Sequence, residues 1–223
     1  MKKTKKWMTA IVAVLMVMTM AATAAGEEAA EAKARAIVGE SARLKEWDLD
    51  DGYYEYEYID GSVSYEVLVD AWSGEVSRIE KRDESVRKAG EGTLTQAEAE
   101  AAAEEASAGG TVEYALLERD DGQYEWKVFV RKGSEVSLYT VQAQSGAIYG
   151  VETYPQGEGV MSAEEAVAAL KAAQGDVEVT ELDLELNDNT HTLRYEGKAQ
   201  SDGRRYEFEM DAADGKQYKW ERD

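Results

Sequence analysis

Apolar and polar residues alternate with a spacing of two along several stretches of the chain, a pattern that is typical of β-strands. The stretches Tyr65–Asp70 and Tyr206–Asp211 alternate cleanly, and the stretch Val177–Leu186 alternates with one shift in phase. Such alternation places one set of side chains on a buried face and the other set in water. The pair Asp51–Gly52 favours a tight turn between antiparallel strands.

Alanine-rich segments precede the predicted strands and have the spacing of three and four residues that indicates helices. Thr95 and Ser162 each stand three residues before a glutamate, Glu98 and Glu165, which is the pattern of a capping box at a helix start. Glycine follows each segment, as expected where the chain leaves a helix through positive φ. These glycines are Gly39, Gly109, Gly110 and Gly175.

One five-residue marker occurs three times, as Asp70–Gly74, Gln142–Gly146 and Asp211–Gly215, and its glycines are 72 and 69 residues apart. A turn and an alanine-rich segment precede each copy in the same order, which indicates an internal repeat. We therefore predict an α+β fold of tandem repeats, each with one helix packed on a four-stranded antiparallel sheet. The predicted segments are a signal peptide at 1–24, repeats at 25–81, 95–154 and 162–223, and linkers at 82–94 and 155–161.

The first 25 residues follow the order of a secretory signal peptide. Four lysines lie within Met1–Lys6, an apolar run extends from Met8 to Met20, and small residues fill positions 21–25. The apolar run is shorter than the roughly 20 residues that a membrane-spanning helix needs. We expect cleavage after Ala24 or Ala25 and a secreted or extracytoplasmic protein with no membrane insertion afterwards. An uncleaved N-terminal anchor is the alternative.

The chain is strongly acidic, with a formal net charge of −21 from 46 acidic and 25 basic residues. Loss of the four lysines of the signal peptide changes this charge to −25. Such a surface repels nucleic acid and anionic lipid headgroups, so we predict neither as a partner. The absence of cysteine from the sequence excludes disulfides, thiol catalysis and cysteine-based zinc sites.

Candidate catalytic residues are scarce, because His191 is the only histidine and we place it at an inward strand position, in the core. No Gly-x-Ser-x-Gly turn accompanies it, which argues against a Ser-His-Asp hydrolase. Glycosidase-type carboxylate pairs are disfavoured, since the acidic residues alternate with apolar ones as on a solvated face. The segment Asp48–Gly52 lacks the spacing and final glutamate of a calcium loop and is better explained as a hairpin turn. We therefore predict no enzyme activity and no catalytic, cofactor-binding or metal-binding residues.

The order of elements resembles the PepSY domain, a small module with an alanine-rich opening helix, a Tyr-Glu-Val-type strand and an Asp-Ala-x-x-Gly turn before its last strand. The matching residues are Tyr65–Val67 with Asp70–Gly74, and Tyr206–Phe208 with Asp211–Gly215. The second repeat departs from this pattern, since Gln142 stands in place of the aspartate. The resemblance implies a secreted or envelope protein of a kind that is proposed to restrain peptidases.

We expect a partner to bind on the sheet face that lies opposite the helix. If Tyr54, Tyr56 and Tyr58 face the helix, then Glu55 and Glu57 face outward. Plain solvation of these side chains is the alternative, and an exposed edge strand that pairs with a strand of the partner is a second binding mode. The predicted partner-binding residues are Glu55, Glu57, Glu66, Glu125, Phe129, Glu207 and Glu209.

These features together predict the class of function. We expect an exported, non-catalytic array of protein-binding modules whose partner is an unidentified protein, with restraint or regulation of a secreted or envelope peptidase as its use. The alternative is an acidic envelope protein that gathers cations or basic cell-wall components through its charge.

Overall fold

A computed structural model describes residues 26–86, 94–120, 122–187 and 190–223. The predicted signal peptide therefore lies outside the described residues, as do most of the first predicted linker and parts of two predicted turns. No helix in this described part of the chain is long and apolar enough to span a membrane.

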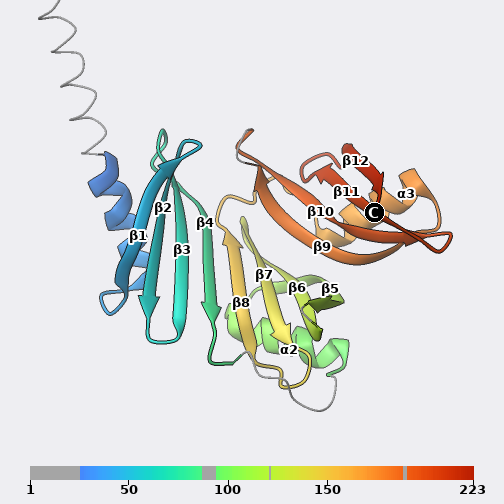
Figure 1. Ribbon diagram of the computed structural model, residues 1–223, viewed down its shortest axis with the longest axis horizontal. Coiled ribbons are helices and arrows are strands. Elements are labelled where there is room, and N and C mark those ends of the chain that lie inside the picture. The colour runs from blue at the N-terminus through green and yellow to red at the C-terminus, as the bar shows by residue number, and fades with distance from the viewer. Residues whose placement is uncertain (1–25, 87–93, 121, 188–189) are drawn as a thin grey trace, which may run out of the picture.

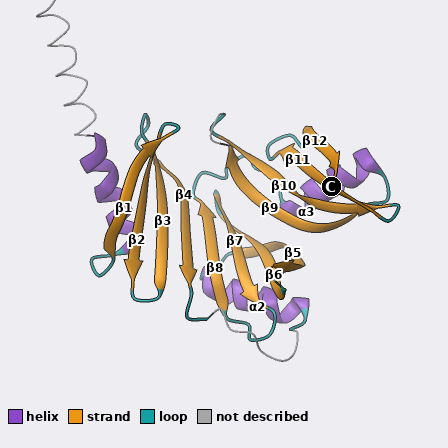
Figure 2. Ribbon diagram, viewed as in Figure 1, coloured by secondary structure: helices purple, strands orange, loops and turns teal. Residues whose placement is uncertain are grey.

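Each of the three repeats consists of one helix and four antiparallel strands, so the predicted fold class is confirmed (Figures 1 and 2). The first repeat has helical residues 26–38, followed by β1 (Arg43–Asp50), β2 (Tyr53–Asp60), β3 (Val63–Asp70) and β4 (Val76–Asp83). The second repeat comprises α2 (Gln96–Ser107), β5 (Thr111–Asp120), β6 (Gln123–Lys132), β7 (Glu135–Gln142) and β8 (Ile148–Tyr154). The third repeat comprises α3 (Ala163–Gln174), β9 (Glu178–Asn187), β10 (Thr192–Ser201), β11 (Arg204–Asp211) and β12 (Gln217–Arg222).

Both predicted capping boxes are present at the helix starts. Thr95 and Ser162 accept hydrogen bonds from the backbone N–H of Glu98 and Glu165, whose carboxylates accept the N–H of the capping residues in return. One helix end differs from the prediction. After α2 the left-handed position is taken by Ala108, with φ 51°, and the glycines follow it.

The recurring five-residue marker is a turn whose aspartate organises the backbone. The Asp70 carboxylate accepts the N–H groups of Trp72 and Ser73 at 2.9 and 2.6 Å, and Gly74 supplies a φ of 69°. The third repeat has the same turn at Asp211. In the second repeat the backbone turn remains, but the Gln142 side chain is fully buried and donates instead to Glu125 at 2.9 Å.

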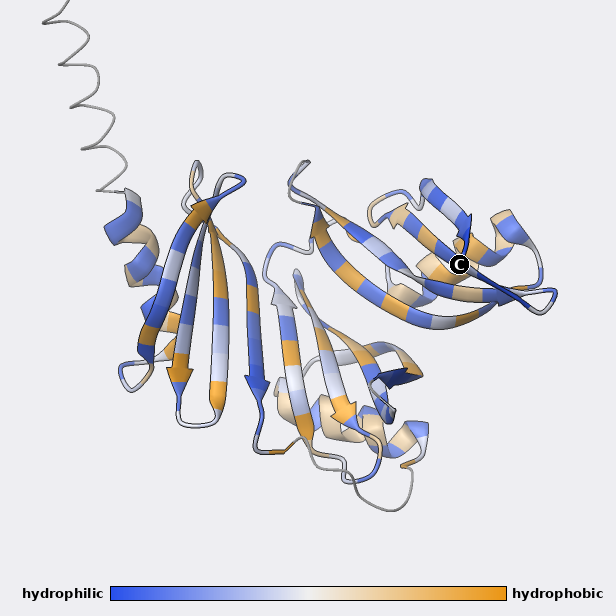
Figure 3. Cartoon of the chain, viewed as in Figure 1, coloured by the Kyte–Doolittle hydropathy of each residue, from blue (hydrophilic) through white to orange (hydrophobic). Residues whose placement is uncertain are grey.

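The first two repeats share one sheet, which the sequence did not predict. β4 pairs antiparallel with β8 from Ile79 opposite Thr153 to Arg82 opposite Gly150, and this joins two four-stranded sheets into one of eight strands. Figure 3 shows that β4 is mostly hydrophilic, whereas β7 and β8 carry more hydrophobic segments. The backbone pairing of β4 with β8 thus joins a mostly hydrophilic strand to a more hydrophobic one (Figure 3).

The third repeat packs on the outer face of the second, the face opposite α2. One apolar cluster contains Phe129 and Leu138 of the second repeat together with Leu182, Leu184 and Tyr195 of the third. The helix α3 and the strand β9 both lie against β5. The third repeat therefore completes its core with residues of its neighbour.

His191 does not occupy the inward strand position that we predicted. It lies in the turn before β10 with φ 54°, and its side chain is 41% exposed. Its ring stacks on Tyr53 of the first repeat at a centroid distance of 4.6 Å, and its Nδ1 lies 3.5 Å from the Asp70 carboxylate. His191 thus connects the third repeat to the first.

Truncation of Phe129 tests the shared core. We expect Phe129→Ala to lower the free energy of unfolding by about 3–5 kcal/mol, because the ring is fully buried between two repeats. Trp72→Ala is the matched control, since Trp72 is 99% exposed and its loss should change stability by less than about 0.5 kcal/mol. Urea denaturation measures both, and equal midpoints for the two variants would contradict the shared core.

Candidate protein-binding surface

A row of glutamates crosses the outer face of the eight-stranded sheet. Five neighbouring strands each place a glutamate directly opposite the glutamate of the next strand. The register pairs Glu46 with Glu57, Glu57 with Glu66, Glu66 with Glu80, and Glu80 with Glu152. The glutamate row consists of Glu46, Glu57, Glu66, Glu80 and Glu152. At about 4.8 Å per strand, it spans roughly 20 Å of the sheet.

The same row continues into the second repeat with apolar residues. Glu152 lies opposite Leu138, which lies opposite Phe129, which lies opposite Tyr114. The change from glutamate to apolar side chains coincides with the part of the face that the third repeat covers. The outer face is thus divided into a charged part over the first repeat and a covered part over the second.

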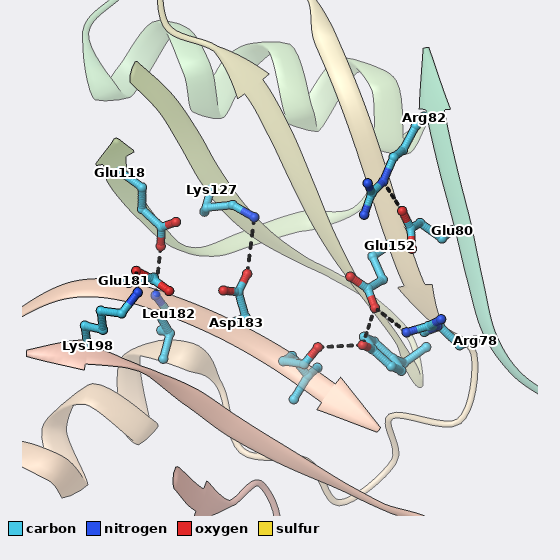
Figure 4. Close-up of polar contacts among 12 residues, drawn as sticks. Arg78, Glu80, Arg82, Glu118, Lys127, Glu152, Glu181, Leu182, Asp183 and Lys198 are labelled. Atoms are coloured by element: carbon cyan, nitrogen blue, oxygen red, sulfur yellow. Dashed lines mark hydrogen bonds and ion pairs between the residues drawn. The ribbon is translucent and has the colours of Figure 1, made fainter. Parts of the chain in front are cut away.

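Cationic side chains neutralise most of the glutamate row. Like charges directly opposite each other on neighbouring strands destabilise a sheet, so such a row needs counter-charges. Glu57 pairs with Lys45, Glu80 with Arg82, and Glu66 with Arg78. Arg78 also lies 3.6 Å from Glu152 and so links the open end of the row to its covered end (Figure 4).

Two adjoining cavities follow the row and form one polar groove. The first, of about 260 Å³, is lined by Lys45, Glu57 and Glu66, and the second, of about 310 Å³, by Lys127 and Glu152. Glu80 and Arg82 line both cavities. Side chains of both signs line the groove, which suits a polar or charged segment rather than an apolar ligand.

Glu152 is a protonation-sensitive contact at the covered end of the row. The Tyr154 hydroxyl lies 2.5 Å from the Glu152 carboxylate and 2.5 Å from the Leu184 carbonyl oxygen of β9. The Tyr154 hydroxyl has one proton, so it can donate to only one of these two oxygens. When it donates to the Leu184 carbonyl, its contact with Glu152 is a hydrogen bond only if the Glu152 carboxyl is protonated and donates to the hydroxyl. Burial raises the pKa of Glu152 and favours that protonated form.

Side chains of the second repeat also satisfy the backbone of β9. The Glu118 carboxylate accepts the Leu182 N–H at 2.8 Å and is only 7% exposed (Figure 4). Lys127 pairs with Asp183 at 3.2 Å beside it. Burial and the nearby Asp183 raise the pKa of Glu118 to about 8, although the Leu182 N–H and Lys127 oppose this shift.

Three of the predicted partner-binding residues share the outer face of the first repeat. Glu57 and Glu66 lie opposite each other in the glutamate row, and Glu55 lies next to Glu57 on the same side of β2. Burial raises the pKa of Glu55, the positive charge of Arg78 opposes this shift, and the charges of Glu57, Asp48 and Asp50 add to it.

The other predicted residues do not join them. Glu125 and Phe129 are 3% and 0% exposed, so the expectation that they lie on an open face is wrong. Phe129 belongs to the apolar cluster shared with the third repeat, whereas the Glu125 carboxylate accepts a hydrogen bond from Gln142 and lines the second cavity of the groove. Glu207 and Glu209 lie on the third repeat, where both contact Lys219.

Sequence reasoning missed Glu80, Arg82 and Glu152. Alternation along β4 could have identified Glu80 and Arg82 as outward-facing residues of the first repeat. The position of Glu152 beside them depends on the pairing of β4 with β8, for which the sequence gives no local signal. Among the described residues, no group of three or more histidine, aspartate or glutamate side chains is placed to hold a metal ion.

Comparison with known proteins identifies the modules. A family model described as "Peptidase propeptide and YPEB domain" matches residues 23–80, 93–152 and 160–221. The curated proteins contain no match to this chain.

Several solved structures are similar to it. The Bacillus megaterium YpeB C-terminal domain is 15% identical with a TM-score of 0.35, covering 87% of this chain and 96% of that one. A candidate lipoprotein from Clostridium difficile 630 is 15% identical with a TM-score of 0.33, covering 61% and 97%. A DUF2874 family protein from Bacteroides uniformis is 16% identical with a TM-score of 0.24, covering 55% and 86%.

The raised pKa of Glu118 predicts that stability falls as pH rises. The folded state keeps the Glu118 proton up to about pH 8, whereas the unfolded carboxyl loses it near pH 4.5. Between these values the folded state binds more protons, so the free energy of unfolding decreases with increasing pH. Glu118→Gln retains an acceptor for the Leu182 N–H and should be about 1–3 kcal/mol more stable than the wild type at pH 9.

Urea denaturation from pH 5 to pH 9 measures this dependence. Glu185, whose pKa burial and the nearby Glu196 raise to about 7, should leave part of the slope in place. Glu104→Gln, at an exposed position of α2, is the matched control and should behave as the wild type. Curves of wild type and Glu118→Gln that run parallel over the whole range would refute the assignment.

Proposed function

The chain belongs to the PepSY family, and from this membership we propose that it is an exported, non-catalytic array of protein-binding modules that restrains or regulates a secreted or envelope peptidase. The observation that carries the proposal is the triple match to a family whose description names peptidase propeptides. A propeptide is a regulatory part of a peptidase rather than its catalytic part. Three such modules in one chain provide a broad surface for a single partner.

The N-terminal sequence supports export. Lysines, a short apolar run and an Ala-x-Ala site follow one another over the first 25 residues, which is the order of a secretory signal peptide. The formal charge of −21 favours solubility outside the cell and attraction to basic surfaces.

The contacts between the repeats support a preorganised binding surface. The β4–β8 pairing joins the first two repeats, the shared apolar cluster joins the second and third, and the stacking of His191 on Tyr53 joins the third and first. Three contacts in a closed triangle restrict motion of each repeat against the others. A surface held in place before binding loses less conformational entropy when a partner docks.

Steric docking is the mechanism that this chain's residues support. The sequence has no cysteine that could react with an active-site group or remove a metal as a thiolate. The acidic residues beside the neutralised part of the row, Glu46, Asp48, Asp50 and Glu55, instead offer negative charge on the same face to basic residues at the rim of a peptidase. Inhibition by this route is reversible and stoichiometric.

The test uses the purified mature chain and the peptidases that the producing cell secretes. We expect the chain to inhibit one of them reversibly at a one-to-one ratio, with inhibition unchanged by excess zinc. Glu55→Lys/Glu57→Lys should slow association at low salt by about tenfold, with the difference shrinking at high salt, because rim charges act mainly on association rate. Glu66 is left intact in this variant, since its loss would free Arg78.

Stopped-flow inhibition kinetics measure the association rate. Glu104→Lys/Glu105→Lys changes the net charge by the same amount on exposed positions of α2 and should leave the rate within about twofold of wild type. Absence of inhibition, or inhibition that disappears when zinc is supplied, would overturn the proposed function.

A further inference from the structure

The two sheets have four edge strands, and these differ in whether other parts of the chain cover them. The edges of the eight-stranded sheet are β1 and β5, and those of the four-stranded sheet are β9 and β12. β9 is capped by Glu118 and Tyr154, and β5 lies beside β9. β1 lies at the end of the sheet and pairs only with β2 among the described strands (Figure 1). All of its residues except Leu44 are exposed.

Two large apolar side chains lie along β1 in spite of its exposure. Trp47 and Leu49 are 42% and 46% exposed, and they lie opposite Tyr56 and Tyr54, on the side of the sheet that the first helix covers. The Trp47 ring stacks on Tyr56 at a centroid distance of 6.4 Å. Residues two apart on a strand share a face, so this pair would contact alternate side chains of an added strand.

The other face of β1 is acidic. Glu46, Asp48 and Asp50 alternate with the two apolar residues. No ion pair within the described residues includes any of the three, although Lys45 pairs with Glu57 nearby. Asp48 and Asp50 add to the effect of burial on the pKa of Glu55, and the cation that opposes them there, Arg78, is already paired with Glu66.

We propose that β1 binds an extended partner segment with alternating basic and apolar residues, which adds to the sheet as a further strand. This proposal rests on the proposed function and names the means by which the partner's segment docks. The basic side chains lie over Glu46, Asp48 and Asp50, and the apolar ones contact Trp47 and Leu49. The backbone of the segment pairs with the edge of β1 and takes over the Leu49 N–H, which otherwise donates to the Asp48 carboxylate at 2.7 Å.

A second copy of this chain is a poor occupant of the same edge. Pairing β1 with another β1 would place acidic residues of both copies on one face, where like charges opposite each other are destabilising. The irregular pairing between Leu44 and Glu46 also limits the regular edge to residues 46–50. Bulges and charges of this kind are ways in which proteins prevent edge-to-edge association with themselves.

The test uses a capped seven-residue peptide of alternating lysine and valine as the probe. A peptide of the same composition with all lysines before all valines should bind at least about tenfold more weakly, because only the alternating order presents one charged and one apolar face. N-methylation of the backbone at alternate residues, on the edge that would pair, should abolish binding. Isothermal titration calorimetry at low salt measures all three affinities, and equal binding of the two lysine–valine orders would overturn the proposal.

Matched variants locate the site. Asp48→Lys/Asp50→Lys should weaken binding of the alternating peptide at least about tenfold, whereas Glu104→Lys/Glu105→Lys, with the same change in net charge, should not. Trp47→Ala should weaken binding, whereas Trp72→Ala, at the fully exposed tryptophan in the turn after β3, should not. Loss of binding in the control variants alone, or a β1-dependent dimer in sedimentation, would overturn the proposal.

The peptidase assay separates this inference from the proposed function. If Asp48→Lys/Asp50→Lys inhibits the peptidase as the wild type does, the edge-strand proposal is wrong and the proposed function stands. If the wild type binds the alternating peptide through β1 but inhibits no peptidase, the edge-strand site stands and the proposed function is wrong.

Discussion

A four-stranded sheet that is covered by a single helix leaves one face and two edges open to water, and each repeat of this chain has that problem. A module of about 60 residues has too few side chains to cover both faces of its sheet, so it buries little surface on its own. The first two repeats remove two edges by pairing β4 with β8. The second and third repeats then remove a face and an edge together, because the outer face of one covers β9 of the other. The triangular arrangement follows from these two solutions.

The outer face of the eight-stranded sheet shows how charge and burial are reconciled along one row. Arg78 connects Glu66, which is open to the groove, with Glu152, which lies against the third repeat. Buried ion pairs seldom add much net stability, because both partners lose their hydration. Removing one partner is costly, so contacts such as Lys127 with Asp183 favour one orientation of the third repeat over others.

The sequence predicted the elements of the fold well and their assembly poorly, for a physical reason. Capping boxes, aspartate turns and period-two alternation are local, so Thr95, Asp70 and the tyrosines of β2 could be assigned without knowledge of the rest of the chain. Alternation says which residues share a face but not what lies on that face, which is why Phe129 was expected to be open. The apolar character of Tyr114, Phe129 and Leu138, at positions where the first repeat has glutamates, was the signal that this face is covered. His191 was misplaced because the turn before β10 is longer than the sequence indicated. The turn includes His191, and β10 begins at Thr192.

The contrast between β9 and β1 limits the shape of what can bind at the free edge. A buried backbone N–H or carbonyl needs a hydrogen-bond partner, and on β9 the Glu118 carboxylate and the Tyr154 hydroxyl supply it at two positions. The outer edge of β1 pairs with no described strand, so a partner that covered its backbone groups without offering hydrogen bonds would leave them unsatisfied, at about 1–3 kcal/mol each. A smooth helix surface cannot supply such bonds along a whole strand, because its own backbone groups are already paired. An extended segment supplies them at every second residue, and the acidic and apolar faces of β1 then select its side chains.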